Sequence, residues 1–69
     1  MEKIIVFANG KAVQIPAGMN ISGLVSHYKL TPSMVMVEVN GTVILRKDWE
    51  TTRLQHGDRV ELVRVVAGG

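Results

Sequence analysis

A β-hairpin is predicted at the start of the chain by residues 3–15, which read KIIVFANGKAVQI. Lys3 to Ala8 is rich in β-branched and aromatic residues, which favour a strand. Asn9-Gly10 follows, and this dipeptide tolerates the two positive φ angles of a type I′ turn, the strongest short-range signal for a hairpin. Lys11 to Ile15 then alternates polar and apolar residues approximately, as the return strand should.

A helix is predicted after the break at Pro16-Ala17-Gly18. Asn20 is a suitable N-cap, because its side-chain oxygen can accept a hydrogen bond from an amide of the first helical turn. We expect the helix to end near Lys29, since Thr31-Pro32 disfavours helical backbone. Spacings of i, i+3, i+4 and i+7 place four apolar residues in one stripe. These residues are Ile21, Leu24, Val25 and Tyr28.

The second half of the chain predicts three more strands. In the first of them, predicted over residues 33–39, Val35, Val37 and Val39 alternate with other residues and so share one face. The elements expected are a strand at 33–39, an Asn-Gly turn at 40–41, a strand at 42–45, a helical turn or irregular crossing at 46–50, a turn at 55–58 and a strand at 59–66.

The predicted fold class is α+β, with one domain over residues 1–69. One main helix on one face of a four- or five-stranded mixed sheet would bury all the apolar stripes, and this is the β-grasp (ubiquitin-like) architecture. We expect the last strand to lie centrally beside the first, because these two are the most continuously apolar. The core is expected to contain Val6, Val13, Ile15, Leu24, Val25, Val37, Val39, Leu54, Val60 and Leu62.

Composition narrows the classes of function. A chain of 69 residues has little core in which to build a substrate pocket, so a self-contained enzyme is not expected. The lack of cysteine excludes disulfides and thiolate zinc sites and fits a reducing cytoplasm. A net charge of +2 with scattered basic residues, and one each of Trp, Tyr and Phe, does not favour nucleic-acid binding. The apolar run Ile4–Phe7 is too short for a signal peptide or a membrane span, so we expect a cytoplasmic protein.

Few side chains are candidates for chemistry. His27 and His56 have no second ligand at a metal-binding spacing, so we expect structural roles for both and no metal site. Ser22, Ser26, His27 and Asp58 include the residue types of a hydrolase triad. No strand–nucleophile–helix turn accompanies them, so no catalytic residue is expected.

Gly68-Gly69, at the end of the sequence, points to a function. Glycine has no Cβ, so the pair can enter a narrow channel and approach a partner's backbone closely. The terminal carboxylate is unhindered and ionised at neutral pH, and it can attack the α-phosphate of ATP. We expect residues 67–69 to extend from the sheet as a flexible tail, and a frayed end without function is the alternative.

Three stretches carry a resemblance to a known family. They are Val39-Asn40-Gly41 before the fourth strand, Leu45-Arg46 with Trp49, and Gly57-Asp58 opening a last strand that runs into Ala67-Gly68-Gly69. In this order, and with this length and end, the chain resembles the ubiquitin-like sulfur carriers of the ThiS/MoaD family, and within it the ThiS carriers of thiamine biosynthesis. The resemblance covers essentially the whole chain.

The resemblance implies a protein co-substrate rather than an enzyme. In the family, an ATP-dependent enzyme of the ThiF type adenylates the terminal glycine, here Gly69. Sulfur from a persulfide on a sulfur-donor protein displaces AMP and leaves a thiocarboxylate, and thiazole synthase of the ThiG type takes this sulfur into the thiazole ring of thiamine. Gly68 and Ala67 would give steric clearance. No cofactor is expected to stay bound, and the free carrier is expected to be a monomer.

Two other readings stay open: a MoaD-like carrier for molybdopterin, and a ubiquitin-like module that binds partners non-covalently through its sheet. Alternation also breaks at Leu62–Val66, so either a bulge occurs or some valines face solvent. We hypothesise that Val63 or Val65 joins Met34 or Met36 in an apolar patch that docks a partner. The alternative is a buried, bulged strand.

Overall fold

Two Asn-Gly turns shape the sheet in the computed structural model, which describes residues 2–65. Asn9 and Gly10 have φ angles of 50° and 83°, and Asn40 and Gly41 have φ angles of 53° and 87°. Two successive positive φ angles are what a type I′ turn requires. Both predicted hairpins are confirmed. Their strands are β1 (Lys3–Ala8) with β2 (Lys11–Pro16), and β3 (Val35–Val39) with β4 (Thr42–Ile44).

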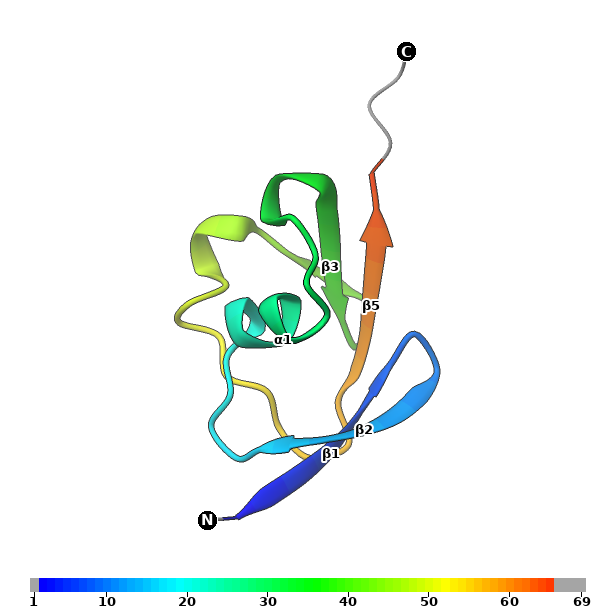
Figure 1. The fold of residues 1–69 in the computed structure, drawn as a ribbon, viewed down its shortest axis with the longest axis vertical. Coiled ribbons are helices and arrows are strands. Elements are labelled where there is room, and N and C mark those ends of the chain that lie inside the picture. Colours follow the sequence, from blue (N-terminus) through cyan, green and yellow to red (C-terminus); the bar gives the residue numbers. More distant parts are fainter. Residues whose placement is uncertain (1, 66–69) are drawn as a thin grey trace.

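The last strand, β5 (Arg59–Arg64), joins the two hairpins into one five-stranded sheet of order β2-β1-β5-β3-β4 (Figure 1). It runs parallel to β1 over only two residue pairs, Phe7 with Arg59 and Ala8 with Val60. Its pairing with β3 is antiparallel and covers five residue pairs. The mixed sheet, with the last strand beside the first, confirms the predicted fold class and topology.

Helix α1 (Ile21–His27) packs on one face of this sheet, and its N-terminus is capped as predicted (Figure 1). The Asn20 Oδ1 atom accepts a hydrogen bond from the Gly23 amide at 2.7 Å, which satisfies one amide of the first turn. Ile21, Leu24 and Val25 of the apolar stripe are buried, whereas Tyr28 is 39% exposed.

The C-terminal end of α1 is closed by a Schellman motif. Lys29 has a φ of 57°. Its amide donates to the Ser26 carbonyl at 2.9 Å, and the Leu30 amide donates to the Val25 carbonyl at 3.2 Å. The helix therefore ends at His27, within two residues of the predicted Lys29, and the reversal of the chain packs Leu30 against the core. Within residues 2–65, no helix has the length and apolar character needed to cross a membrane.

The core differs from the predicted set at its margins. Val13, Val39 and Leu62 are only partly buried. Val13 lies on the edge strand β2, Val39 ends β3, and Leu62 extends past the end of β1. Four buried residues were not in the predicted core: Ala8, Ile21, Val35 and Trp49. The buried core consists of Val6, Ala8, Ile15, Ile21, Leu24, Val25, Val35, Val37, Trp49, Leu54 and Val60.

Several predicted boundaries are corrected. Strand β4 ends at Ile44 and not at residue 45. Residues 33 and 34 belong to a 3₁₀ turn, η1 (Pro32–Met34), and not to a strand, because proline is pre-set for a first helical turn and has no N–H to give to a sheet ladder. The segment expected to cross at 46–50 forms a shorter 3₁₀ turn, η2 (Arg46–Asp48). The last strand ends at Arg64, and Val66 lies outside the described residues.

Candidate functional site

Apolar side chains are exposed at the end of the β3–β5 ladder. Met36 and Val63 lie directly opposite each other in the ladder and are 39% and 40% exposed. One step further on, the Val65 amide donates to the Met34 carbonyl at 2.8 Å, and both residues are exposed. We call Met34, Met36, Val63 and Val65 the ladder-end patch. The structure thus brings together the four residues that the sequence proposed for docking.

The exposure of this patch follows from an unbroken register. The pairs run from Val35 with Arg64 to Val39 with Val60, and no residue is skipped. The buried, bulged strand weighed as an alternative is therefore wrong for this ladder. Because side chains alternate between faces, Val60 and Leu62 point toward α1, and Val63 points to the opposite face.

Two of the motifs behind the family resemblance meet at the start of β5. The Asn40 Nδ2 group donates to Asp58 Oδ1 at 3.0 Å, and the Arg59 amide donates to Asn40 Oδ1 at 2.9 Å. The second oxygen of Asp58 accepts from the Gln55 amide at 2.8 Å. Asp58, a residue type of the rejected hydrolase triad, thus joins the β3–β4 turn to the turn before β5.

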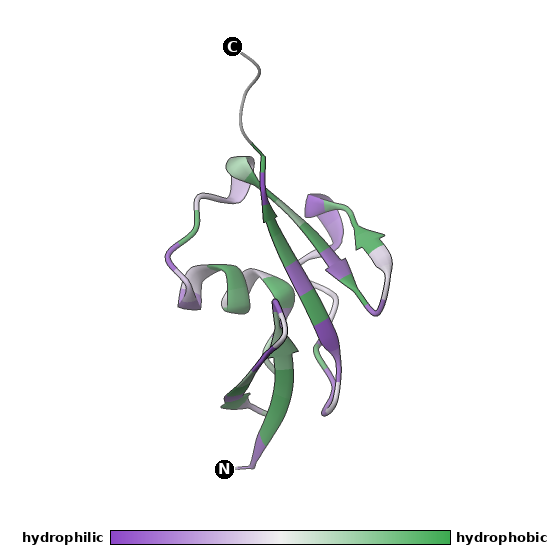
Figure 2. Cartoon of the chain, turned by 90° about the vertical axis from the view of Figure 1, so that its right-hand side faces the viewer, coloured by the Kyte–Doolittle hydropathy of each residue, from purple (hydrophilic) through white to green (hydrophobic). Residues whose placement is uncertain are grey.

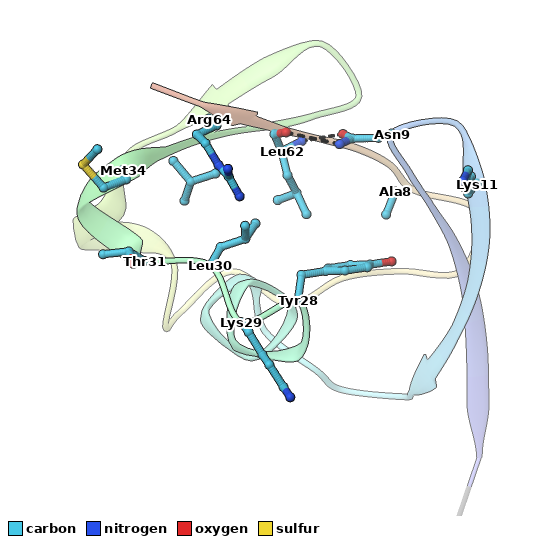
Figure 3. A pocket seen from close by; sticks show the side chains of 11 residues that line it. Ala8, Asn9, Lys11, Tyr28, Lys29, Leu30, Thr31, Met34, Leu62 and Arg64 are labelled. Carbon is cyan, nitrogen blue, oxygen red and sulfur yellow. Dashed lines mark hydrogen bonds between the residues drawn. The ribbon is translucent and has the colours of Figure 1, made fainter. Parts of the chain in front are cut away.

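The other Asn-Gly turn binds the opposite edge of β5. The Leu62 amide donates to Asn9 Oδ1 at 2.7 Å, and Asn9 Nδ2 donates to the Leu62 carbonyl at 3.2 Å (Figure 3). The Asn9 backbone amide also donates to the Val60 carbonyl at 2.9 Å. The Asn9 side chain therefore takes the place of one residue of a neighbouring strand, just beyond the end of β1.

The third motif is structural as well. Trp49 is 3% exposed, and its Nε1–H donates to the Ile44 carbonyl at 2.9 Å. Burial with a satisfied ring N–H is the usual state of a core tryptophan. The described parts of these stretches therefore have structural roles: Asn40 and Asp58 fix the start of β5, and Trp49 belongs to the core beside β4.

The two histidines make local contacts. His56 Nδ1 accepts a hydrogen bond from the Ile5 amide at 3.1 Å, which confirms a structural role. The ring of His27 meets the Tyr28 ring edge-on, with centroids 5.0 Å apart. Within the part of the chain that the structure describes, no three histidine or carboxylate side chains come together as a metal site.

Comparison with known proteins assigns the family on the basis of nearly the whole chain. Residues 3–69 match the ThiS family. The chain belongs to the ThiS family. The crystal structure of the thiamine biosynthesis protein (ThiS) of Geobacter metallireducens superposes with a TM-score of 0.83 at 30% identity, covering 96% of this chain and all of that one. The family resemblance and the β-grasp fold are both confirmed.

Two relatives of this ThiS-family chain differ greatly in length. The sulfur carrier protein ThiS of Escherichia coli K12 is 27% identical over 64 residues, which are 93% of this chain and 97% of the relative. A thiazole synthase of Magnetococcus marinus is 31% identical over 64 residues, 93% of this chain but only 20% of the relative. The chain thus spans about a fifth of the length of that synthase.

The remaining predicted site residues of this ThiS-family chain lie outside the described part. Ala67, Gly68 and Gly69 belong to residues 66–69, so the predicted tail and its chemistry stay predictions. Val65 is the last residue that the structure describes, and it is 47% exposed.

The sequence reasoning missed further exposed apolar side chains on β1. Ile5 and Phe7 are 38% and 40% exposed. Figure 2 shows β1 hydrophobic along nearly all its length, whereas hydrophilic and hydrophobic residues alternate along much of β5. The signal was present, because a sheet covered by a helix on one face buries only every second residue of a continuously apolar strand.

Proposed function

We propose that this chain is a sulfur carrier of thiamine biosynthesis that acts through the carboxylate of Gly69. The match to the ThiS family carries this proposal, because it extends through residue 69 and so includes Gly68-Gly69. The Escherichia coli relative named a sulfur carrier supports it, since the similarity covers nearly the full length of both chains. In this role the chain is a protein co-substrate, and the catalysis belongs to its partners.

The proposed chemistry has three steps. A carboxylate oxygen of Gly69 attacks the α-phosphorus of ATP on a ThiF-type enzyme, pyrophosphate leaves, and an acyl adenylate forms. The terminal sulfur of a donor persulfide attacks the acyl carbon and AMP leaves. A thiol then cleaves the resulting S–S bond, so the sulfur stays on the carrier as a thiocarboxylate while the two thiol sulfurs become a disulfide. Gly68 and Ala67 leave room for the tail in a narrow channel, since neither has a bulky side chain.

Thiazole synthase is the proposed sulfur acceptor. A thiazole synthase of Magnetococcus marinus contains a segment similar to this chain over about a fifth of its length. A carrier-like segment and a synthase within one polypeptide favour a direct transfer between the two. Because the chemistry consumes ATP, we expect the carrier to act in the cytoplasm, as a monomer when free.

The ladder-end patch is the proposed docking surface for the ThiF-type enzyme. Its members, Met34, Met36, Val63 and Val65, are each about two-fifths exposed or more. Exposed clusters of apolar side chains commonly mark interfaces. The patch also lies at the end of β5, directly before residues 66–69, so an enzyme docked there would be close to the reacting end of the chain.

The decisive experiment is intact-mass analysis after incubation with a ThiF-type enzyme, ATP and a sulfur donor. We expect the mass change that corresponds to exchange of one oxygen for sulfur, and no change without ATP. Deleting Gly69 should leave the melting temperature unchanged and abolish the product, because a displacement of about 1 Å can cost roughly 100-fold in rate. Thiocarboxylation of the deletion variant at the wild-type rate would contradict the mechanism.

A second variant separates steric clearance from chain length. Gly68→Val keeps the length and adds a branched side chain, so we expect normal melting and a severe loss of adenylation, measured by pyrophosphate release. A C-terminal tag should likewise abolish carrier function. If the tagged chain performs its cellular role normally, the non-covalent binding module is the better reading.

Glutamate substitutions within the ladder-end patch test whether it is the docking surface. Met36→Glu and Val63→Glu should each weaken binding to the ThiF-type enzyme and leave the melting temperature nearly unchanged, since both residues are substantially exposed. Ile5→Glu is the matched control, because Ile5 is 38% exposed but lies on β1, away from the patch. Equal affinity of all three variants and the wild type would rule out the patch.

A further inference from the structure

A groove of about 670 Å³ opens between the C-terminal end of α1, the β1–β2 turn and β5 (Figure 3). Its apolar lining includes Ala8, Leu30, Val35 and Leu62, and Tyr28 forms one wall. The volume lies in the range of sites that bind small molecules or side chains. The groove is on the α1 side of the sheet, because Val60 and Leu62 face α1 and Val63 of the ladder-end patch faces the opposite way.

The groove exists because two elements end early. The Schellman motif stops α1 at His27 and turns Leu30 toward the sheet. Strand β1 stops at Ala8, opposite Val60, whereas β5 continues to Arg64. Within residues 2–65, the second half of β5 therefore has no neighbouring strand on the β1 side.

The backbone of β5 is left partly open along this edge. In an antiparallel pair, successive residues direct their N–H and C=O groups alternately to the two sides. The Val65 amide donates to the Met34 carbonyl on the β3 side of β5. The backbone N–H and C=O groups of the even-numbered residues of β5 therefore point toward the β1 side. The Val60 carbonyl accepts from Asn9, and both groups of Leu62 are bonded by the Asn9 side chain. The corresponding groups of Arg64 receive no such partner from residues 2–65.

The charged residues that line the groove are all basic. Lys11, Lys29 and Arg64 line it, and no Asp or Glu does. Figure 3 shows the Arg64 side chain reaching over the groove toward Leu30, whereas the Lys29 ammonium points away from it. A ligand that complements this surface has a negative charge near Arg64 and an apolar group that packs on the apolar lining of the groove.

We propose that the groove binds a short, extended, acidic segment of a partner protein, which adds as a strand beside Arg64. Its backbone pairs with the N–H and C=O of Arg64, in the manner of β-strand addition to an open sheet edge. One of its apolar side chains packs on Tyr28, Leu30 and Leu62, and a neighbouring carboxylate pairs with the Arg64 guanidinium. Met34 of the ladder-end patch also borders the groove, but Met36 and Val63 lie on the opposite face of the sheet. The inference does not depend on the sulfur-carrier proposal.

The test is a titration of the ¹⁵N-labelled full chain with a short capped peptide in which valine and isoleucine alternate with aspartate and glutamate. We expect saturable shifts at the amides of Ala8, Leu30, Leu62 and Arg64, and an affinity that falls as salt is added. Arg64→Gln should weaken binding by about tenfold, the value of one charge-assisted hydrogen bond. Lys29→Gln removes the same charge from a side chain that points away, and it should change the affinity by less than about twofold.

Two control peptides separate the components of the site. A peptide with lysine at every acidic position should not bind. A peptide methylated at its central amides keeps the charges but cannot pair with Arg64, so it should bind more weakly than the parent. The proposal is overturned by an absence of saturable shifts, by equal binding of the lysine peptide or the methylated peptide, or by shifts centred on Met36 and Val63. Equal weakening by Lys29→Gln and Arg64→Gln would overturn it as well.

Discussion

The two halves of β5 are held very differently. In the first half, Arg59 bonds to Asn40 through both its backbone groups, and the Val60 carbonyl accepts from Asn9 on the other side. Val60 is completely buried. In the second half, β3 is the only neighbouring strand among residues 2–65, and the Asn9 side chain makes the last hydrogen bonds on the β1 side, at Leu62.

This difference separates stability from recognition within one strand. The first half pairs with both β1 and β3 and buries Val60, so it contributes most to the stability of the fold. The second half places Met36 and Val63 on one face of the sheet and the groove beside Leu62 and Arg64 on the other. Segments with fewer buried contacts open more readily and are where binding surfaces are commonly found. Three predictions test this division.

The largest effect is expected from paired truncations in the two halves. Val60→Ala should lower the free energy of unfolding by about 2–3 kcal/mol, because it removes two buried methyl groups and leaves a cavity. Val63→Ala should change it by less than about 0.5 kcal/mol, as is usual for a surface site. Urea denaturation of the two variants measures the contrast, and equal losses would refute the division of β5.

An intermediate effect is expected at the β3–β4 turn. Asn40→Gly keeps the positive φ angle accessible but removes the two side-chain hydrogen bonds, to the Asp58 carboxylate and to the Arg59 amide, so we expect a loss of about 1–2 kcal/mol. Asp58→Asn is the companion variant, since it can retain one acceptor for Asn40. It should cost less than Asn40→Gly in the same denaturation experiment, and a larger cost would show that the charge of Asp58 carries the interaction.

The smallest effect on global stability is expected at the β1–β2 turn. Asn9→Gly also preserves the turn, but the two bonds that it removes go to Leu62 in the less supported half of β5. We expect a loss of no more than about 1 kcal/mol. Hydrogen exchange should accelerate strongly at the Leu62 amide and little at the Val60 amide. Uniform acceleration along β5 would mean that the strand opens as one unit.

Local signals predicted much of the fold. The two Asn-Gly turns, the Asn20 cap and the helix end before Thr31-Pro32 each depend on the backbone preferences of adjacent residues. The 3₁₀ turn at Pro32–Met34 was missed because Val35, Val37 and Val39 dominated the alternation pattern. Trp49 was missed as a core residue because it lies in an irregular segment, where no period indicates which side is buried.

The sequence by itself determined the hairpins and the helix, because each depends on residues that are neighbours in the chain. Only the tertiary structure decided what surrounds β5. Asn9 bonds to a residue 53 positions away, and Asn40 bonds to one 18 positions away. The groove likewise depends on where α1, β1 and β5 end relative to one another. No local backbone preference encodes contacts between residues so far apart in the chain, since these contacts are set by how the hairpins and the helix pack together around one core.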